Sequence, residues 1–297
     1  MRVTNQMIKG SVTRDIMQNT ERLFQMQNIV STGKRINRPS DDPVGMSNVL
    51  DYRKTLSSIN QYESNIAHGE MWIEVTESSL ETINDLLGTA KNIAIDYSSE
   101  TIELDTREEA AATIKQIYDQ VLDLANSTLG DSYIFAGHKT DTPPFSRNDD
   151  YHAAYSGDNG DIKIVAGEDV DIKINTTGED LFVTGVNVFD ALRDLKDALE
   201  APIFDASAVS AQIEPLIDAC DQIQKGRTEN AGTFTRLETT KNQLAGFKLN
   251  VEDMLYNTEN ADMTRAIMEL QSQETAYQAS IATGARIIQP SLLDYLK

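Results

Sequence analysis

Four glutamates have the spacing that comes closest to a catalytic pattern in this chain. Glu70, Glu74, Glu77 and Glu81 recur every three or four residues, which places them on one face of a helix. Paired carboxylates can act as general acid and base when their surroundings separate their pKa values. On an exposed helix the same row is a solvated stripe of charge, and this is the interpretation we favour.

The histidines and the cysteine are too few and too scattered for a metal centre. The chain has three histidines and one cysteine, and His68, His138 and His152 have no partners at metal-ligand spacing. We interpret them as surface or turn residues, and Cys220 as a small apolar residue on a helix seam. The segment Asp158–Asp161 hints at a calcium loop but lacks the spacing and final glutamate of an EF-hand, so we expect a tight turn.

Other chemical motifs are missing from the sequence. It contains no G-x-G-x-x-G, Walker, G-x-S-x-G or H-E-x-x-H pattern. Asn126 and Asn175 begin glycosylation acceptor patterns, which mean little without a secretory signal. We therefore predict no catalytic residue, no metal ligand and no cofactor, and a chain that is not an enzyme.

Composition and charge exclude further classes. The net charge of −21 argues against a nucleic-acid partner, because phosphates require a basic surface. No apolar run approaches the roughly 18 residues of a membrane span, and the N-terminus lacks the apolar region of a signal peptide. We predict no nucleic-acid partner, no membrane segment and no cleaved signal peptide.

Most of the chain is predicted to be helical, because apolar residues recur in alternating steps of three and four. This stripe is the seam of a coiled coil. It runs over residues 59–94, 110–128, 209–255 and, after a slip near Asn257–Asn260, 263–288. A continuous helix of about 80 residues at 1.5 Å each would span roughly 120 Å. We therefore expect a mainly α protein, an elongated rod of long coiled-coil-like helices.

The middle of the chain has a different period. Val170, Ile172 and Ile174 alternate with polar residues, which predicts a strand. Residues 162–166 precede it across a Gly-Glu-Asp turn and should complete a hairpin, with 133–136 and 151–155 as candidate partner strands. We expect a small inserted β domain at 131–186. A helical rod domain of 43–130 plus 187–260 would flank it, and terminal helices 1–42 plus 261–297 would form an assembly segment.

The apolar stripes at the two ends have two possible partners. They could pack on each other within one molecule, or between molecules, because two helices expose more stripe than they can bury alone. The sequence leaves both arrangements open.

Specific motifs at the two ends resemble a known family. Residues 31–45, STGKRINRPSDDPVG, are similar to the N-terminal signature of bacterial flagellins and their relatives, and 261–266 with 273–280 resemble the C-terminal signature. Within that superfamily, residues 133–137, 142–145 and 188–192 are similar to the hook-associated protein 3 branch. The resemblance covers essentially the whole chain.

The resemblance implies an extracellular structural protein of the bacterial flagellum, placed at the hook–filament junction and exported through the type III apparatus. Its expected partners are further copies of itself in a ring, hook-associated protein 1 on the hook side, flagellin on the filament side, and a cytoplasmic export chaperone at the C-terminal helix. Assembly would use apolar residues of the terminal helices: Ile8, Val12, Ile16, Leu23, Ile267, Leu270, Ile281, Ile288, Leu292 and Leu293.

Three other functions stay open at this point. A filament flagellin shares the terminal signatures. A secreted effector or adhesin could carry flagellin-like ends. An enzyme on a coiled-coil scaffold would need a polar pocket, and only residues 131–186 could form one.

Overall fold

The chain is mainly helical, as its periodicity predicts. The computed structural model describes residues 5–98 and 104–288. Its long helices are α1 (Asn5–Thr32), α2 (Pro43–Asp96), α3 (Leu104–Ala125), α7 (Ile213–Glu259) and α8 (Met263–Ile288). Three shorter helices are α4 (Gly178–Phe182), α5 (Val188–Glu200) and α6 (Ala206–Ala211).

The described residues form two compact units. Unit 1 holds the residues up to Ser58 together with those from Gly246 onward, and unit 2 holds Ile59–Ala245. Unit 1 therefore contains α1, α8, the first part of α2 and the last part of α7. Unit 2 contains the rest of α2 and α7, helices α3 to α6, and all the strands.

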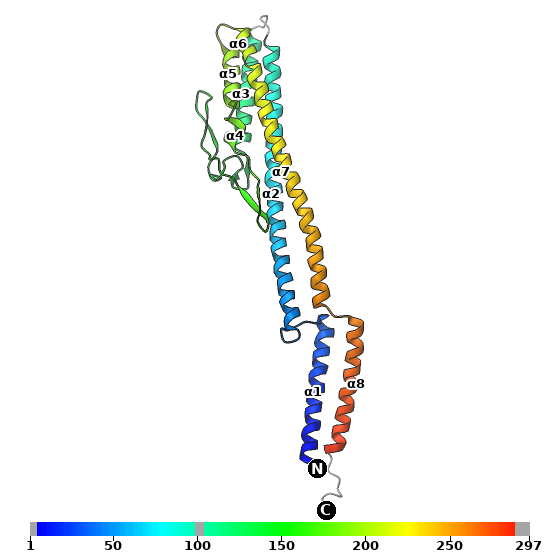
Figure 1. The fold of residues 1–297 in the computed structure, drawn as a ribbon. Helices are drawn as coiled ribbons and strands as arrows, with labels where there is room; N and C mark the ends of the chain where they lie inside the picture. The colour runs from blue at the N-terminus through cyan, green and yellow to red at the C-terminus, as the bar shows by residue number, and fades with distance from the viewer. Residues whose placement is uncertain (1–4, 99–103, 289–297) are drawn as a thin grey trace, which may run out of the picture. The chain divides into compact units, whose positions relative to one another are not determined.

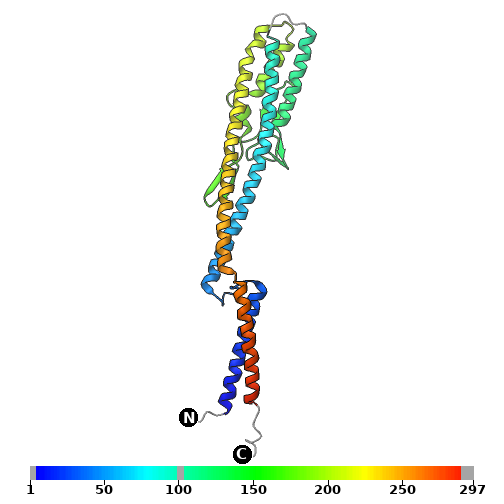
Figure 2. The same cartoon turned by 90° about the vertical axis from the view of Figure 1, so that its right-hand side faces the viewer.

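The predicted seam of α2 is the side of the helix that forms the core of unit 2. Its apolar positions between Ile59 and Ala94 are buried or half-buried, and so are the seam positions of α7. In unit 2 the two helices lie side by side (Figure 2). Asn230 of α7 donates its amide to the Ile73 carbonyl of α2 at 3.1 Å, in the middle of this contact. The 3-4 spacing thus identified the packed face correctly.

The glutamate row of α2 is partly an ion-pairing face, which corrects its interpretation as a solvated stripe. Glu70 pairs with Lys241 of α7 at 2.7 Å, and Glu77 pairs with Arg227 of α7 at 2.8 Å. The carboxylates therefore flank the α2–α7 seam, as the charged edge positions of a coiled coil do.

The inserted segment contains three separate two-stranded antiparallel hairpins. They are β1 (Thr128–Leu129) with β2 (Ser132–Tyr133), β3 (Phe145–Arg147) with β4 (Ala153–Tyr155), and β5 (Lys163–Gly167) with β6 (Val170–Lys173). The β5–β6 hairpin confirms the prediction for residues 162–174. Of the candidate partner strands, 151–155 contains β4 and 133–136 overlaps β2 only at Tyr133. Their predicted pairing with the β5–β6 hairpin was wrong, because β2 pairs with β1 and β4 pairs with β3.

Two glycines let the insert approach the long helices closely. A Cβ at Gly69 of α2 would lie 2.8 Å from Ile164 Cδ1, and one at Gly226 of α7 would lie 2.3 Å from Leu181 Cδ2. Both distances are below van der Waals contact, so only glycine fits without a shift of the neighbour. The β5–β6 hairpin therefore rests on α2, and α4 rests on α7.

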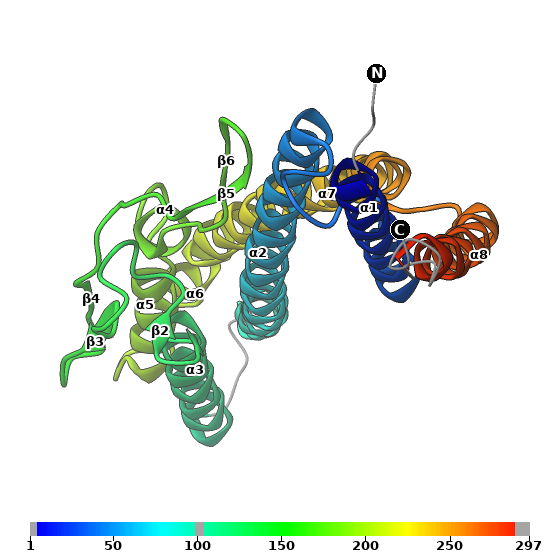
Figure 3. The same ribbon diagram turned by 90° about the horizontal axis from the view of Figure 1, so that it is seen from below.

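Helix α3 packs against α5, and the β3–β4 hairpin lies beside them (Figure 3). Aromatic rings fill this contact. Phe145 of β3 meets Phe182 and Phe189 with ring centroids 5.4 Å and 5.1 Å apart, and Tyr118 of α3 meets Phe189 at 5.5 Å. Edge-to-face packing of this kind orders the insert against the helices.

Helix boundaries follow the expected breakers. Pro43 begins α2, and the Asp42 carboxylate accepts the Gly45 N–H at 2.9 Å, which is an N-cap. The 209–288 stripe is not one helix, because α7 ends at Glu259 and α8 begins at Met263. The slip in phase near Asn257–Asn260 marks this break.

Candidate functional site

The terminal helices α1 and α8 pack along each other in unit 1 (Figures 1 and 2). They approach closely at Gly284 of α8, where an added Cβ would lie 3.0 Å from Ile16 Cδ1 and 3.2 Å from Val12 Cγ1. A glycine opposite two branched side chains allows the helix axes to come close. The stripes at the two ends of the chain therefore meet within one molecule.

The ten predicted assembly residues fall into three groups. Four are half-buried in the single chain: Val12, Ile16, Leu23 and Leu270. Three are exposed: Ile8, Ile267 and Ile281. The Ile288 side chain, Leu292 and Leu293 lie outside what the structure describes. The structure thus brings part of the set together and leaves another part facing outward.

Large apolar side chains that the seam pattern did not include are exposed on the same two helices. Met17 and Phe24 of α1 and Met268 of α8 have 66%, 60% and 62% of their surface accessible. Two packed helices have no third layer to cover their outer faces, so these side chains stay in water. They were missed because they lie off the 3-4 register, although large apolar residues outside a seam are themselves a signal.

The same kind of surface continues on the other helices of unit 1. Exposed large apolar residues on the first part of α2 and the last part of α7 are Val44, Leu50, Phe247, Leu249, Met254 and Tyr256. Large apolar side chains exposed on all four helices of one unit are candidates for contact with another protein. This apolar surface of unit 1 is our candidate functional site.

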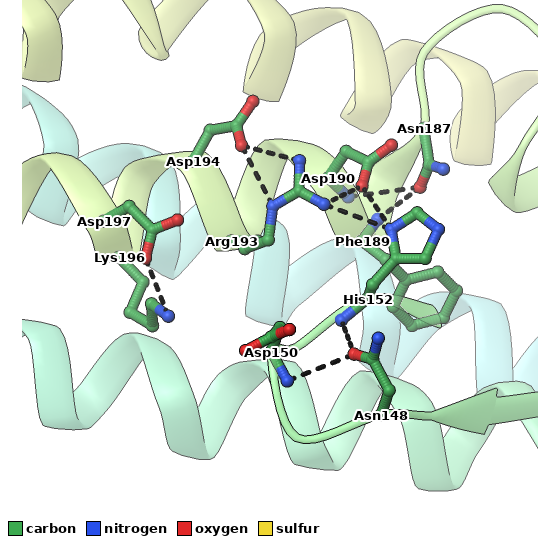
Figure 4. A network of polar contacts seen from close by, with 10 residues as sticks. All are labelled: Asn148, Asp150, His152, Asn187, Phe189, Asp190, Arg193, Asp194, Lys196 and Asp197. Atoms are coloured by element: carbon green, nitrogen blue, oxygen red, sulfur yellow. Dashed lines mark hydrogen bonds and ion pairs between the residues drawn. The ribbon is translucent and has the colours of Figure 1, made fainter. Parts of the chain in front are cut away.

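The histidines have structural surroundings. His68, His138 and His152 are exposed. His152 follows the β3–β4 turn, where its N–H donates to Asn148 Oδ1 at 2.9 Å (Figure 4). Its Nδ1 lies 3.2 Å from Arg193 Nη1 on α5, and Arg193 also pairs with Asp190 at 2.7 Å (Figure 4). This network fastens the hairpin to α5.

The two glycosylation patterns place their asparagines in structural roles. Asn126 donates to the Phe145 carbonyl at 3.0 Å and accepts the Phe145 N–H at 2.9 Å. Asn175 accepts the Ile162 N–H and donates to the Gly160 carbonyl, both at 2.8 Å. Each amide pairs with backbone as a neighbouring strand would, so neither side chain is free to be modified.

The segment Asp158–Asp161 is a turn stabilised by its first carboxylate. Asp158 Oδ1 accepts the Gly160 N–H at 3.0 Å and the His138 N–H at 2.6 Å, and these bonds lower the pKa of that carboxyl. Within residues 5–98 and 104–288, no three histidine, cysteine, aspartate or glutamate side chains are arranged to hold a metal ion.

Burial is the main cause of three further pKa shifts. It raises the pKa of Tyr118 and of Tyr155 to about 12, and it also raises the pKa of Cys220 on α7. These groups lie in or against the core and not around a shared cleft. Among the helices in the described ranges, none has the length and apolar content needed to cross a membrane.

Comparison with protein families and curated proteins gives one consistent result. Residues 3–140 match the family described as bacterial flagellin N-terminal helical region. The chain is 27% identical to flagellar hook-associated protein 3 of Escherichia coli over 94% of its own length and 95% of that protein. It is 24% identical to a flagellar filament core protein of Treponema maltophilum, over 86% and 85% of the two chains.

Solved structures share the fold. A flagellar hook-associated protein from Vibrio parahaemolyticus superimposes with a TM-score of 0.70 at 21% identity, over 74% of this chain and all of the other. FlgL from Bacillus cereus does so with a TM-score of 0.60 at 24% identity, over 69% and 99% of the two chains. At these identities the structures establish the fold of the chain.

Proposed function

We propose that this chain, a member of the bacterial flagellin family with hook-associated protein 3 relatives along most of its length, joins the hook of the flagellum to its filament. The family consists of structural, non-enzymatic proteins. The observation that carries the proposal is the alignment with a hook-associated protein 3 over 94% of this chain and 95% of that relative. A match from end to end includes the insert as well as the terminal helices.

The proposed mechanism is packing of the terminal helices against neighbouring subunits. In the single chain α1 and α8 cover only part of each other's seam and leave Met17, Phe24, Ile267 and Met268 exposed. Burying one fully exposed side chain of this kind contributes about 1.5–3 kcal/mol. Because 51–66% of each of the four side chains remains to be buried, together they give roughly 4–7 kcal/mol before the cost of association. This contribution favours packing of the subunit against its neighbours.

The remaining parts of the proposal follow from the family. The neighbours would be copies of the same chain, hook-associated protein 1 towards the hook and flagellin towards the filament, with an export chaperone on the C-terminal helix before secretion. Residues 1–42 and 261–297 would form the assembly segment, 43–130 and 187–260 the helical rod domain, and 131–186 the outer β domain.

Deletion of the gene is the primary test. The proposal predicts cells that keep their hooks, lack filaments and shed flagellin into the medium. A normal filament after deletion would contradict the junction function and favour a secreted effector or adhesin.

A charge on the apolar surface tests the mechanism. Ile281→Asp should block filament attachment while the exported chain stays folded, because a carboxylate cannot be desolvated cheaply at a subunit contact. Ser272→Asp is the matched control, since it adds the same charge at an exposed polar position of α8. Attachment lost only in the first variant supports the mechanism, and attachment kept in both contradicts it.

A filament flagellin is the second candidate, because the Treponema filament core protein also aligns with most of this chain. Abundance separates the two functions. A junction protein forms a minor component of sheared filaments, whereas a flagellin forms their bulk.

A further inference from the structure

The two segments that connect the terminal helices to α2 and α7 are paired with each other in unit 1. Residues 33–42 join α1 to α2, and residues 260–262 join α7 to α8. Lys34 and Asn260 form an antiparallel bridge, and the Ala261 N–H donates to the Gly33 carbonyl at 2.9 Å. The connections therefore behave as one short two-stranded element and not as independent loops.

A buried carboxylate lies at the centre of this element. The Glu259 side chain is only 7% exposed, and its Oε1 accepts Lys34 Nζ at 2.6 Å and Arg53 Nη2 at 2.5 Å. Lys34 belongs to the first connection, Arg53 to α2, and Glu259 is the last residue of α7. One carboxylate thus joins three elements, and we call Glu259, Lys34 and Arg53 the Glu259 cluster.

The main chain of Glu259 also forms hydrogen bonds with the first connection. The Glu259 carbonyl accepts the N–H of Arg35 at 2.7 Å and of Ile36 at 3.3 Å, and Arg35 Nη2 donates to the Thr258 carbonyl at 2.9 Å. These are the last carbonyls of α7, which have no partner within the helix. The first connection therefore caps the C-terminus of α7.

The position is an unfavourable one for an unpaired carboxylate. The C-terminal end of a helix carries partial negative charge, and burial removes the water that would stabilise the anion. Two cations at hydrogen-bond distance offset both effects, and loss of one partner from a buried pair leaves an uncompensated charge. The geometry of the connections therefore depends on this charge balance.

We propose that Glu259 is a positioning residue: the Glu259 cluster locks the two connections together and fixes the direction in which α1 and α8 leave α2 and α7. The consequence for assembly rests on the proposed function, because the terminal helices must reach neighbouring subunits from a defined direction. None of the three residues of the cluster is itself one of the exposed apolar residues named above, so its proposed effect on assembly is through the connections.

Hydrogen exchange on the purified full chain tests the cluster directly. In Glu259→Gln the amides of Arg35, Ile36 and Ala261 should exchange roughly 10-fold faster or more, because charge-assisted hydrogen bonds are lost while the half-exposed Lys34 and Arg53 can turn to water. The amides of residues 80–87 in unit 2 should keep their protection. Glu269→Gln is the control, because Glu269 forms an exposed pair with Arg265 on α8 and such pairs contribute little. Unchanged exchange at the three amides would overturn the proposal.

A second pair of variants separates charge from packing. Arg53→Lys keeps a cation near Glu259 and should retain most of the protection, whereas Arg53→Met keeps a long apolar side chain and should lose it. Equal protection in the two variants would show that the charge does not hold the connections, and would also overturn the proposal.

Filament attachment tests the consequence for assembly. Exported Glu259→Gln should fail to support attachment although the apolar surface is unchanged, and attachment retained with open connections would overturn that consequence. If instead the unaltered chain is dispensable for attachment, the proposed function fails, while the exchange experiment still reports on the cluster.

Discussion

The buried Tyr118 and the half-buried Tyr155 of unit 2 should respond differently to removal of their hydroxyl groups. Tyr118 is 1% exposed, and its hydroxyl has no hydrogen-bond partner within the described ranges. The Tyr155 hydroxyl lies 3.1 Å from the Phe135 carbonyl and 3.0 Å from the Asp158 carbonyl, and donates towards them. Substitution by phenylalanine removes one oxygen in each case but changes the hydrogen bonding in only one.

The expected magnitudes follow from this difference. A buried polar group without a partner costs about 1–3 kcal/mol, so Tyr118→Phe should leave the free energy of unfolding unchanged or raise it by about 1 kcal/mol. Tyr155→Phe removes the hydroxyl that donates to the two carbonyls. It should therefore lower the free energy of unfolding by about 1–3 kcal/mol. The two variants should therefore differ by about 1–4 kcal/mol. At roughly 2–4 °C per kcal/mol for a domain of this size, this is a difference in Tm of about 2–16 °C.

Urea and thermal unfolding of the full chain at pH 7, followed by circular dichroism, measure these values. Equal destabilisation by the two substitutions would refute the reasoning, because it would mean that the Tyr118 hydroxyl has a partner or that ring packing alone decides. A pH series adds a check. Each tyrosine has a pKa raised to about 12, because burial disfavours the ionised form in the fold. The free energy of unfolding is therefore unaffected by these groups below about pH 10 and falls as pH rises from about 10 towards 12. Tyr118→Phe should remove part of that loss.

Three further predictions concern packing and capping. Gly69→Val should lower the free energy of unfolding by about 1–3 kcal/mol, because the added side chain overpacks the contact. Gly88→Ala should raise the free energy of unfolding by about 0.5–1 kcal/mol, because a Cβ at that position meets open space. Thermal melts in which both variants shift Tm in the same direction would contradict this. Val121→Asp buries an unpaired carboxylate at a fully buried position of α3 and should lower Tm by more than about 5 °C, so an unchanged Tm would refute its place in the core. The pKa of Asp42 is lowered chiefly by the Gly45 N–H, so the contribution of the ionised carboxylate is present above the usual carboxyl range and lost as pH falls through the lowered value. A smaller protection factor at Gly45 in acid, with no such pH dependence in Asp42→Ala, is the expected result.

The spacing of apolar residues predicted those elements that are specified by residues close together in the sequence. The apolar stripe from Ile59 to Ala94 gave the buried face of α2, including the small residue Gly69 and the polar residue Thr76. The β5–β6 hairpin was predicted because a short turn connects its strands. A local sequence pattern predicts the observed structure when it agrees with the tertiary contacts.

Pairings between distant residues could not be predicted in the same way. Arg53 and Glu259 are 206 positions apart, and no pattern near either residue indicates the other. Strand β3 follows two prolines, and its pairing with β4 depends on aromatic contacts with α4 and α5. The exposed part of the candidate site was missed for a related reason, since periodicity identifies the face that packs and not the apolar residues that remain outside it.

The single cysteine gives this protein a built-in chemical reporter. Cys220 is half-buried on α7 and packed against the core of unit 2, and burial raises the pKa of its thiol. An alkylating reagent reacts with the exposed thiolate, so the labelling rate at fixed pH is set by how often the surrounding helices separate. Because the chain has no other thiol, this rate could be followed in the free subunit and again after assembly without engineering a probe. The ratio of the labelling rates in the free and the assembled subunit would show how strongly the neighbouring subunits restrain the opening of unit 2.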